Sequence, residues 1–255
     1  MTYHIDEPGR NEAQAFLEQH LDRNLSMLGS LIFEPLEQLR GVRQGDTLVA
    51  LAVVVPGEAN VPGALPSVLT DALDDVALHA LVNAGGYPQH AVWNVQQPNY
   101  RMLLEHMLGQ QHDESRGVVY FIADTAMPEQ RVRARQLLAG DTTVDLAPCN
   151  LGAMALSYWI LRGWHVFGVV EDGRLLGHAV ASYPIADTEE VAAVFTAPEA
   201  RRRGVASACA AAAITNIRER GKRAVYVSRK NNAASIAVAE GLGMRRLCET
   251  WEIET

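Results

Sequence analysis

The chain has 255 residues, of which 48% are hydrophobic and 20% charged, a composition typical of globular proteins with a sizeable core. A net charge of -8 and scattered basic residues exclude the electrostatic footprint of a duplex-binding protein, so we expect no nucleic-acid partner. Three widely spaced cysteines, Cys149, Cys209 and Cys248, exclude a disulfide framework and paired metal ligands, and they fit a reducing compartment.

The start of the chain, residues 1–7, lacks the basic stretch and apolar core of a secretory signal. No apolar run approaches the roughly 18 residues that span a membrane. His165 and His178 stand at a spacing that gives no metal set, so both are interpreted as structural. We therefore expect a cytoplasmic protein with no membrane partner and no metal.

The first half alternates helical and extended patterns. Amphipathic spacing predicts one or two helices over 11–32, and a glycine turn predicts a hairpin of 39–42 with 47–55. Proline near the start and glycines past the end predict a helix over 65–82. The other predicted elements are a strand at 91–95, a helix at 99–108 and a strand at 118–123.

The second half repeats this order. Residues 128–138 carry proline and glycine signals of a helix, which we favour, although arginines alternate there as in an exposed strand. Asp172 and Gly173 between apolar runs predict a hairpin of 165–170 with 175–183. The other predicted elements are helices at 151–161, 205–220 and 232–240 and strands at 191–195, 224–228 and 247–253. We therefore predict two tandem α/β units, 1–127 and 128–255.

The stretch from Val194 to Ser207 combines basic charge with a predicted helix start. An apolar strand ends at Pro198, three arginines lead to Gly204, and an alanine-rich helix follows. Free backbone N–H groups at a helix start, a close backbone approach at glycine and guanidinium groups together favour phosphate binding. Neither a Walker loop nor a dinucleotide fingerprint is present. The alternative is a solvated arginine loop that only caps the helix.

Two motifs here resemble those of the GNAT family of acyl-CoA N-acetyltransferases. Arg201-Arg202-Arg203-Gly204-Val205-Ala206 matches the family's Arg/Gln-x-x-Gly-x-Gly/Ala signature between a strand and a helix. Residues 232–244 look like the family's Asn-x-x-Ala/Ser helix, which ends in Leu-Gly-Phe/Met. The resemblance covers 166–255 well and the first half only by the order of elements. It implies an α/β (α+β) fold with a mixed, mostly antiparallel twisted sheet and helices on both faces.

The resemblance also implies a co-substrate, acetyl-CoA or another acyl-CoA. Its pyrophosphate would lie on the backbone of 202–207, and its pantetheine chain would pair with 194–196 like an added strand. Asn232 and Ser235 would line the other side, near the thioester. The implied cofactor-binding residues are Val194, Phe195, Thr196, Arg201, Arg202, Arg203, Gly204, Val205, Ala206, Ser207, Asn232 and Ser235.

The catalytic groups are less evident. Many family members carry a tyrosine as general acid where this chain has Ala239, which cannot donate a proton. A thiol with a pKa near 8.5 still leaves readily as thiolate. The amine must lose a proton, and Glu190 is the candidate base, because several family members carry a glutamate at this place. The alternative is that Glu189 and Glu190 are solvated loop charges.

The leading hypothesis is direct transfer of an acyl group, as in an N-acetyltransferase, to a primary amine of a small molecule or peptide; an oligomer is possible. A non-catalytic acyl-CoA binding or sensing protein, or a module for another anion, is the alternative. In the first half, the turn matching the phosphate loop is predicted at 56–63, which has glycines but no basic residue. We therefore expect the first unit to be a degenerate GNAT-like copy without a CoA site.

Overall fold

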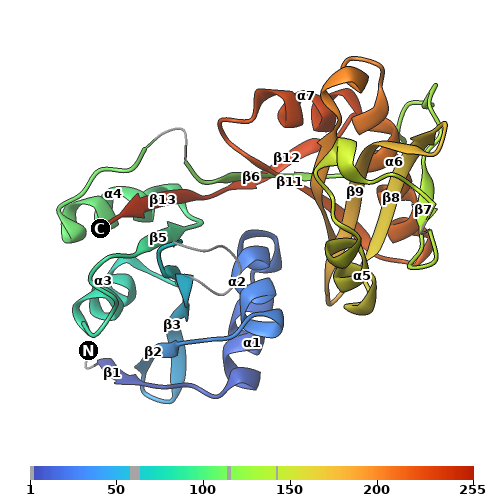
Figure 1. Ribbon diagram of the computed structural model, residues 1–255. Helices are drawn as coiled ribbons and strands as arrows, with labels where there is room; N and C mark the ends of the chain where they lie inside the picture. Colours follow the sequence, from blue (N-terminus) through green and yellow to red (C-terminus); the bar gives the residue numbers. More distant parts are fainter. Residues whose placement is uncertain (1–2, 58–63, 114–115, 142) are drawn as a thin grey trace. The chain divides into compact units, whose positions relative to one another are not determined.

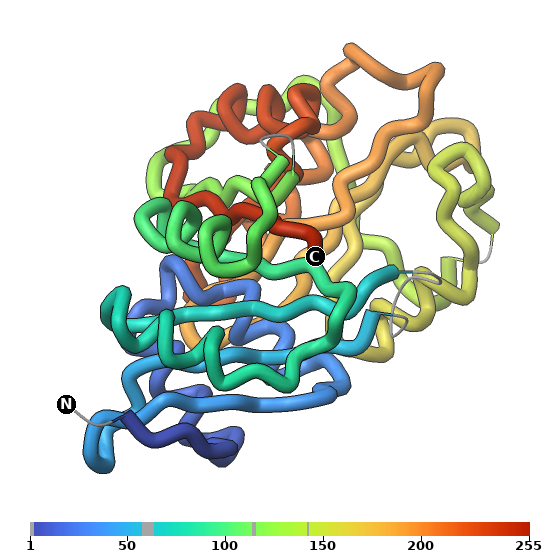
Figure 2. The backbone as a smooth tube through the Cα atoms, turned by 90° about the vertical axis from the view of Figure 1, so that its left-hand side faces the viewer, coloured from blue at the N-terminus to red at the C-terminus, as the bar shows by residue number. Residues whose placement is uncertain are grey.

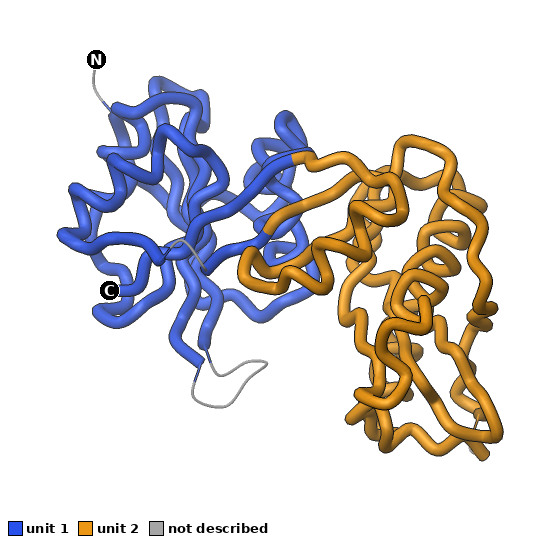
Figure 3. Tube along the Cα trace, turned by 90° about the horizontal axis from the view of Figure 1, so that it is seen from above, with its two compact units in different colours: residues 1–118, 248–255 blue, residues 119–247 orange. Residues whose placement is uncertain are grey.

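The protein forms two compact units. The computed structural model describes residues 3–57, 64–113, 116–141 and 143–255 (Figure 1). Unit 1 comprises Met1–Val118 and Cys248–Thr255, and unit 2 comprises Val119–Leu247 (Figure 3). No helix within the described ranges has both the length and the apolar composition needed to cross a bilayer.

Unit 1 is built on a mixed sheet whose neighbouring strands pair antiparallel, except for the parallel pair β4 and β5. Across the sheet, the described strands are β1 (Tyr3–Asp6), β2 (Gln38–Gln44), β3 (Thr47–Val55), β4 (Ser67–Ala72), β5 (Val92–Val95) and β13 (Trp251–Glu254). The helices are α1 (Arg10–Glu18), α2 (Leu21–Phe33), α3 (Asp75–Asn83) and α4 (Pro98–Leu108).

Unit 2 has a second mixed sheet, in which β7 to β10 pair antiparallel in sequence and β10 pairs parallel with β11. Across the sheet, the described strands are β7 (Arg135–Leu137), β8 (His165–Glu171), β9 (Arg174–Ile185), β10 (Thr188–Thr196), β11 (Arg223–Arg229), β6 (Val118–Ile122) and β12 (Arg245–Glu249). The helical segments are η2 (Ala147–Cys149), α5 (Ala153–Leu161), η3 (Pro198–Ala200), α6 (Val205–Glu219) and α7 (Ala233–Gly241).

The two units follow one plan. In each, three antiparallel strands lead to a helix, a parallel strand and another helix: β2, β3, β4, α3, β5 and α4 in unit 1, and β8, β9, β10, α6, β11 and α7 in unit 2. The predicted fold class, a mixed and mostly antiparallel α/β sheet, is confirmed. In unit 1, β4 therefore corresponds to β10 of unit 2, and the turn after β4 corresponds to the turn after β10.

In each sheet, the outer neighbour of the second parallel strand comes from the other half of the sequence. β13, at the end of the chain, pairs with β5, whereas β6, which follows α4, lies beside β11. Figure 2 shows the red C-terminal end next to green segments of unit 1. The predicted division at residue 127 differs from the compact units at two places, because 119–127 lie in unit 2 and 248–255 in unit 1.

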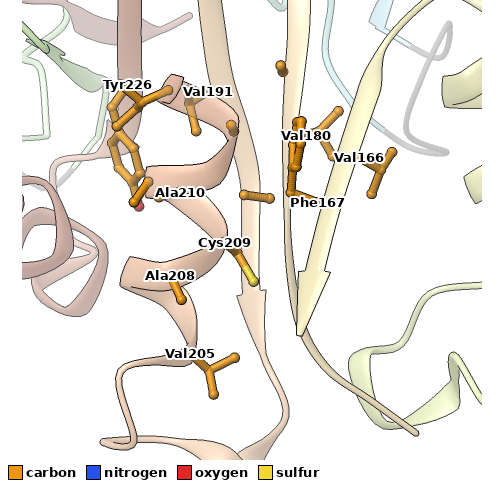
Figure 4. Packing of buried hydrophobic residues seen from close by; sticks show 14 of the residues in the cluster. Val166, Phe167, Val180, Val191, Val205, Ala208, Cys209, Ala210 and Tyr226 are labelled. Atoms are coloured by element: carbon orange, nitrogen blue, oxygen red, sulfur yellow. The ribbon is translucent and has the colours of Figure 1, made fainter. Parts of the chain in front are cut away.

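Unit 2 buries one helix deeply against its sheet. α6 packs on β8, β9 and β10 through small side chains such as Ala208 and Cys209, both buried (Figure 4). Close approach is also built into β9, where a Cβ on Gly177 would lie 2.5 Å from Cγ1 of Val205. The next residue, His178, faces the other way and contacts Trp159 of α5. The two helices therefore cover opposite faces of the sheet.

One predicted helix, over 65–82, is too long at its start, and another, over 128–138, is wrong. Residues 67–72 form β4, a buried strand paired on both sides, and the helix begins only at Asp75, where the Oδ1 atom of Asp74 accepts a 2.7 Å hydrogen bond from the Ala77 N–H. Residues 128–138 contain β7 instead of a helix, because Arg135, Gln136 and Leu137 pair as an edge strand with β8. The predicted last strand is two strands, β12 and β13, and the other predicted elements agree within a few residues.

Candidate active site

β10 and β11 run side by side only at their starts and then part. Parallel pairing joins 188–191 to 223–226 and ends at Val191 and Tyr226. On its other side, β10 slips in register against β9 between Ala192 and Phe195, and Ala193 takes a φ of 48°. A bulge of this kind bends a strand. We call the place where the two strands separate the fork; backbone groups of β10 beyond it have no partner on β11.

A cavity of about 630 Å³ lies at the fork. Eleven of the twelve residues predicted to bind the cofactor line it: Val194, Phe195, Thr196, Arg201, Arg202, Gly204, Val205, Ala206, Ser207, Asn232 and Ser235. The rest of the wall is formed by Ala200, Tyr226, Ala234 and Val238, to which no sequence pattern pointed. The strand, the basic turn and the α7 helix thus meet around one space.

The basic turn has the backbone of an anion site. Arg202 and Gly204 have φ values of 62° and 82°, and Gly204 is the N-cap of α6. Left-handed residues in such turns direct successive N–H groups toward one concavity, and the first turn of a helix leaves its N–H groups free. The guanidinium groups of Arg201 and Arg202 are exposed and form no ion pair within the described chain. Both are therefore available to an anion in the cavity.

Arg203 is the predicted residue that does not line the cavity. Its Nη2 atom donates to both carboxylate oxygens of Glu171, at 2.9 and 2.7 Å. Both side chains are about half exposed. Arg203 therefore links the basic turn to the end of β8, while Arg201 and Arg202 line the cavity.

Two hydroxyl groups meet in the cavity wall. Tyr226 Oη and Ser235 Oγ are 2.8 Å apart, and the ring of Tyr226 is fully buried. Asn232 Oδ1 accepts a 3.1 Å hydrogen bond from the backbone N–H of Ser235, which fixes the start of α7. The sequence carries no distinct signal for Tyr226, because β11 also holds Ser228, another buried residue with a hydroxyl group. Ala239 lies in the core and does not line the cavity.

The adjacent glutamates of β10 occupy opposite environments. Glu189 is 2% exposed and accepts hydrogen bonds of 2.6 and 2.8 Å from Arg220. Glu190 is partly buried and has no hydrogen-bonding or ionic partner among the described residues. Burial raises the pKa of Glu190 to about 7. The alternative that both are solvated loop charges is wrong, because both lie within β10.

Glu190 lies at the fork on the sheet face opposite to Tyr226. It pairs with Val225, one position before the Val191–Tyr226 pair, and neighbouring strand residues point to opposite faces. On β9 its register partner is Ser182, whose buried Oγ has no hydrogen-bond partner in the part of the chain that the structure describes. Burial lowers the pKa of His178, four residues before Ser182 in β9, to about 4, so this histidine is neutral at pH 7. Glu190 is thus a carboxylate with a raised pKa beside the fork, and it is not one of the residues that line the cavity.

The cysteines of unit 2 are poor nucleophiles. Cys149 and Cys209 are both buried and free. Burial raises the pKa of the Cys149 thiol to about 11 and that of the Cys209 thiol to about 12. Since the thiolate is the reactive form, neither side chain is suited to accept an acyl group at neutral pH.

Unit 1 carries acidic groups at the corresponding place. The turn after β4 holds Leu73 and Asp74, and Asp75 begins α3. The predicted counterpart at 56–63 is wrong in position, because it connects the antiparallel β3 and β4; residues 58–63 lie outside the described residues. Just beyond the last paired residues of β4 and β5, Asp71 accepts hydrogen bonds from Arg23, Asn24 and Gln97.

Most of unit 2 is similar to a known protein family. Residues 134–244 match the profile of the Acetyltransferase (GNAT) family. The whole chain has the fold of a GCN5-related N-acetyltransferase from Sphaerobacter thermophilus, with a TM-score of 0.70, 14% identity and coverage of 99% of this chain and 95% of that one. A search of curated proteins found no match.

Two further solved structures share the fold over the full length. One is a tandem GNAT protein from the clavulanic acid biosynthesis pathway, with a TM-score of 0.63, 15% identity and coverage of 99% and 98%. Another is a GNAT-family acetyltransferase from Colwellia psychrerythraea, with a TM-score of 0.64, 14% identity and coverage of 100% and 99%. With the fork, the basic turn and the α7 helix in the matched segment, residues 134–244 are an acetyltransferase domain of the GNAT family.

Proposed function

We propose that the protein is an acyl-CoA-dependent N-acyltransferase that transfers an acetyl group from acetyl-CoA directly to a primary amine. The observation that carries this proposal is the cavity of about 630 Å³, lined by eleven of the twelve residues for which a cofactor role was predicted. Unit 1, with acidic residues after β4 and a hydrogen-bonded carboxylate beyond its own parallel pair, is proposed to be a degenerate copy without a cofactor.

The cofactor would bind in two parts. Its pyrophosphate would accept hydrogen bonds from backbone N–H groups at the start of α6 and from Arg201 and Arg202, since charge-assisted bonds to phosphate are strong. Its pantetheine amides would pair with the β10 backbone at 194–196, which has no strand partner on the β11 side. This arrangement would bring the thioester to the fork.

The reaction would then proceed at the fork. At pH 7 only about one lysine-like amine in 2500 is neutral, so a base is required. Glu190, whose pKa is raised to about 7, would take one proton from the ammonium form of the amine. The nitrogen would form its bond to the thioester carbon, the carbon–sulfur bond would break, and the electron pair would leave with the sulfur. The nitrogen would release its second proton to solvent as the amide forms, and the thiolate would take a proton from solvent after release.

A non-catalytic acyl-CoA sensor is the second candidate. The observation that favours it is the buried alanine at position 239, where many GNAT enzymes carry their acid. Thiol release from acetyl-CoA with a panel of primary amines, measured against a blank without amine, separates the two. Amine-dependent release supports the enzyme, and binding of acetyl-CoA without such release supports the sensor.

The cofactor site itself is tested with two glycine variants. Gly204→Glu places bulk and negative charge where phosphate would lie, so calorimetry should show CoA binding weakened more than about tenfold. Gly221→Glu is the matched control, since Gly221 also has a positive φ and open space where a Cβ would lie, but it is past the end of α6 and does not line the cavity. Equal CoA affinities of the two variants would contradict the phosphate assignment.

A further inference from the structure

The hydroxyl pair of Tyr226 and Ser235 lies beside the place where the strands part. Tyr226 is the last residue of β11 paired with β10, and Ser235 is in the first turn of α7. Both line the cavity, and their oxygens are 2.8 Å apart. In Figure 4 the Tyr226 ring lies near Val191 and Ala210, within the core.

The two hydroxyl groups differ in access. Tyr226 has no exposed surface, whereas Ser235 is partly exposed. The serine hydroxyl is therefore the one that a ligand in the cavity can reach. The phenol lies behind it and can donate its proton to Ser235 Oγ, which leaves the Ser235 hydroxyl hydrogen free to turn toward a ligand.

The environment keeps the phenol in its donating form. Burial raises the pKa of Tyr226, so this side chain retains its proton at neutral and mildly alkaline pH. A chain of two hydroxyl donors strengthens the outer one, because each hydrogen bond polarises the next. Asn232 holds the serine backbone in place through the 3.1 Å bond to the Ser235 N–H.

The hydroxyl pair is placed to stabilise an atom that gains negative charge on the cavity side of the sheet. Glu190 and Tyr226 occupy consecutive register positions at the fork but opposite faces. A thioester carbon in the fork would therefore have the carboxylate on one side and the hydroxyl pair on the other. The atom that leaves with an electron pair, the sulfur, would be on the hydroxyl side.

We propose that Ser235 is a catalytic residue that donates a hydrogen bond to the departing CoA sulfur, and that Tyr226 is the positioning residue that orients and polarises it. The inference rests on the proposed function for its chemistry. No full proton transfer is needed, because the carbon–sulfur bond breaks with both electrons on sulfur and the thiolate is stabilised by the bond from Ser235. The hydroxyl pair thereby supplies the hydrogen-bond donor to sulfur that Ala239 cannot provide.

The first test does not require turnover. Free CoA is bound to the protein, and the ultraviolet absorbance of its thiolate is followed as the pH is raised. Wild-type protein should lower the pKa of the bound thiol relative to Ser235→Ala, with about tenfold more thiolate at a given pH. Ser235→Thr, which keeps a hydroxyl, should resemble the wild type, and Tyr226→Phe should lie between wild type and Ser235→Ala.

The second test uses turnover with two acyl donors. With acetyl-CoA, Ser235→Ala should lower kcat about tenfold to hundredfold with little change in the KM for acetyl-CoA. With phenyl thioacetate, whose aryl thiolate leaves more easily, the same variant should lose much less. Tyr100→Phe is the control, because it removes another buried phenol hydroxyl, which donates to the Ala72 carbonyl in unit 1.

The outcomes are distinct for the two proposals. A bound-thiol pKa that is the same in wild type and Ser235→Ala would overturn the role of the hydroxyl pair, whatever the activity. Equal losses with both acyl donors would also overturn it. Absence of amine-dependent thiol release in the wild type would instead remove the proposed enzyme function, and a thiolate titration that differs between the variants would still support the hydrogen bond to sulfur.

Discussion

Neighbouring residues of one strand carry opposite roles in unit 2. Glu189 and Glu190 are the same residue type, one position apart, yet the first is locked to Arg220 and the second is unpaired among the described residues. Alternation along β10 is the cause, because it turns one carboxylate toward a guanidinium and the other toward the opposite face. Sequence alone identified Glu190 as a candidate base by resemblance, but only the pairing partners distinguish it from Glu189.

Glu190→Gln is expected to remove the rise of activity with pH. In the wild type, kcat/KM for the amine should increase with an apparent pKa of about 7, as the carboxyl group ionises and can accept a proton. In the variant, kcat/KM should no longer rise with pH, and at pH 8 it should be about hundredfold or more below that of the wild type. Steady-state rates from pH 5.5 to 9 measure both effects, and an unchanged profile would exclude Glu190 as the base.

Glu190→Gln should also change stability in a direction fixed by the sign of its pKa shift. The folded-state pKa lies above the ordinary value of 4.5, so the folded protein holds a proton that the unfolded chain has lost between about pH 4.5 and 7. Stability from this group is therefore present at low pH and is lost as the pH rises through 7. Urea unfolding at pH 8 should show the variant to be more stable than wild type.

Glu189→Gln is the matched variant at the neighbouring position. Removing the charge leaves Arg220 without its carboxylate in a partly buried site, so unfolding should require about 2 kcal/mol less. The pH dependence of its activity should stay like that of the wild type. If Glu189→Gln removed the rise of activity with pH and Glu190→Gln kept it, Glu189 and not Glu190 would be the base.

At the scale of elements, the two units differ in what lies beyond their parallel strand pair. In unit 2 the region beyond the pair holds the cavity, whereas in unit 1 it holds a polar network centred on Asp71, which is 1% exposed. Arg23 and Asn24 of α2 and Gln97 just before α4 donate to this carboxylate. Within unit 1 this network links a helix, a strand and a turn, and it leaves the carboxylate no free role.

Asp71→Ala should destabilise unit 1 markedly. It removes the carboxylate that accepts hydrogen bonds from the buried amide of Asn24 and the guanidinium of Arg23, at a cost of about 3 kcal/mol. Asp74→Ala, three residues on, removes only the N-cap of α3 and should cost about 1 kcal/mol. Chemical denaturation compares the two variants, and similar losses would show that the network contributes little.

Element types were predictable where spacing and turn signals agreed. The hairpin at Asp172 and Gly173 follows from a local preference, and the basic turn before α6 follows from residues adjacent in sequence. β4 was not predictable in this way, because pairing with both β3 and β5 overrides the proline and glycine signals around it. Tyr226 was missed since its hydroxyl contacts Ser235, a residue of the next helix, and this contact exists only in the folded chain.

At the scale of the whole molecule, the sequence order of the strands does not follow the order of the units. Pattern reasoning found the repeat but divided it at residue 127, since nothing local tells whether a strand stays with the helix before it. The register shows that β13 forms four residue pairs with β5, from Trp251–Val95 to Glu254–Val92. Unit 1 therefore depends on residues that are far apart in the sequence.

A fragment of residues 1–127 should fail to give a cooperative thermal transition by circular dichroism. It lacks β13 and leaves β5 as an open edge, without the fully buried Ile253 that packs into the core of unit 1. A second fragment, in which a flexible linker joins 1–118 to 248–255, should recover the transition. A sharp transition of 1–127 alone would show that the exchanged strand is dispensable.

The exchanged strand also sets an order of events during protein synthesis. β5 ends at residue 95 and its partner begins at residue 251, so a long stretch of chain is synthesised between them. At ribosomal speeds this interval lasts on the order of ten seconds. During that time the N-terminal sheet presents an unpaired edge, and a nascent chain in this state is a target for chaperones and for premature association. The first unit can therefore be completed only after β13 has emerged from the ribosome.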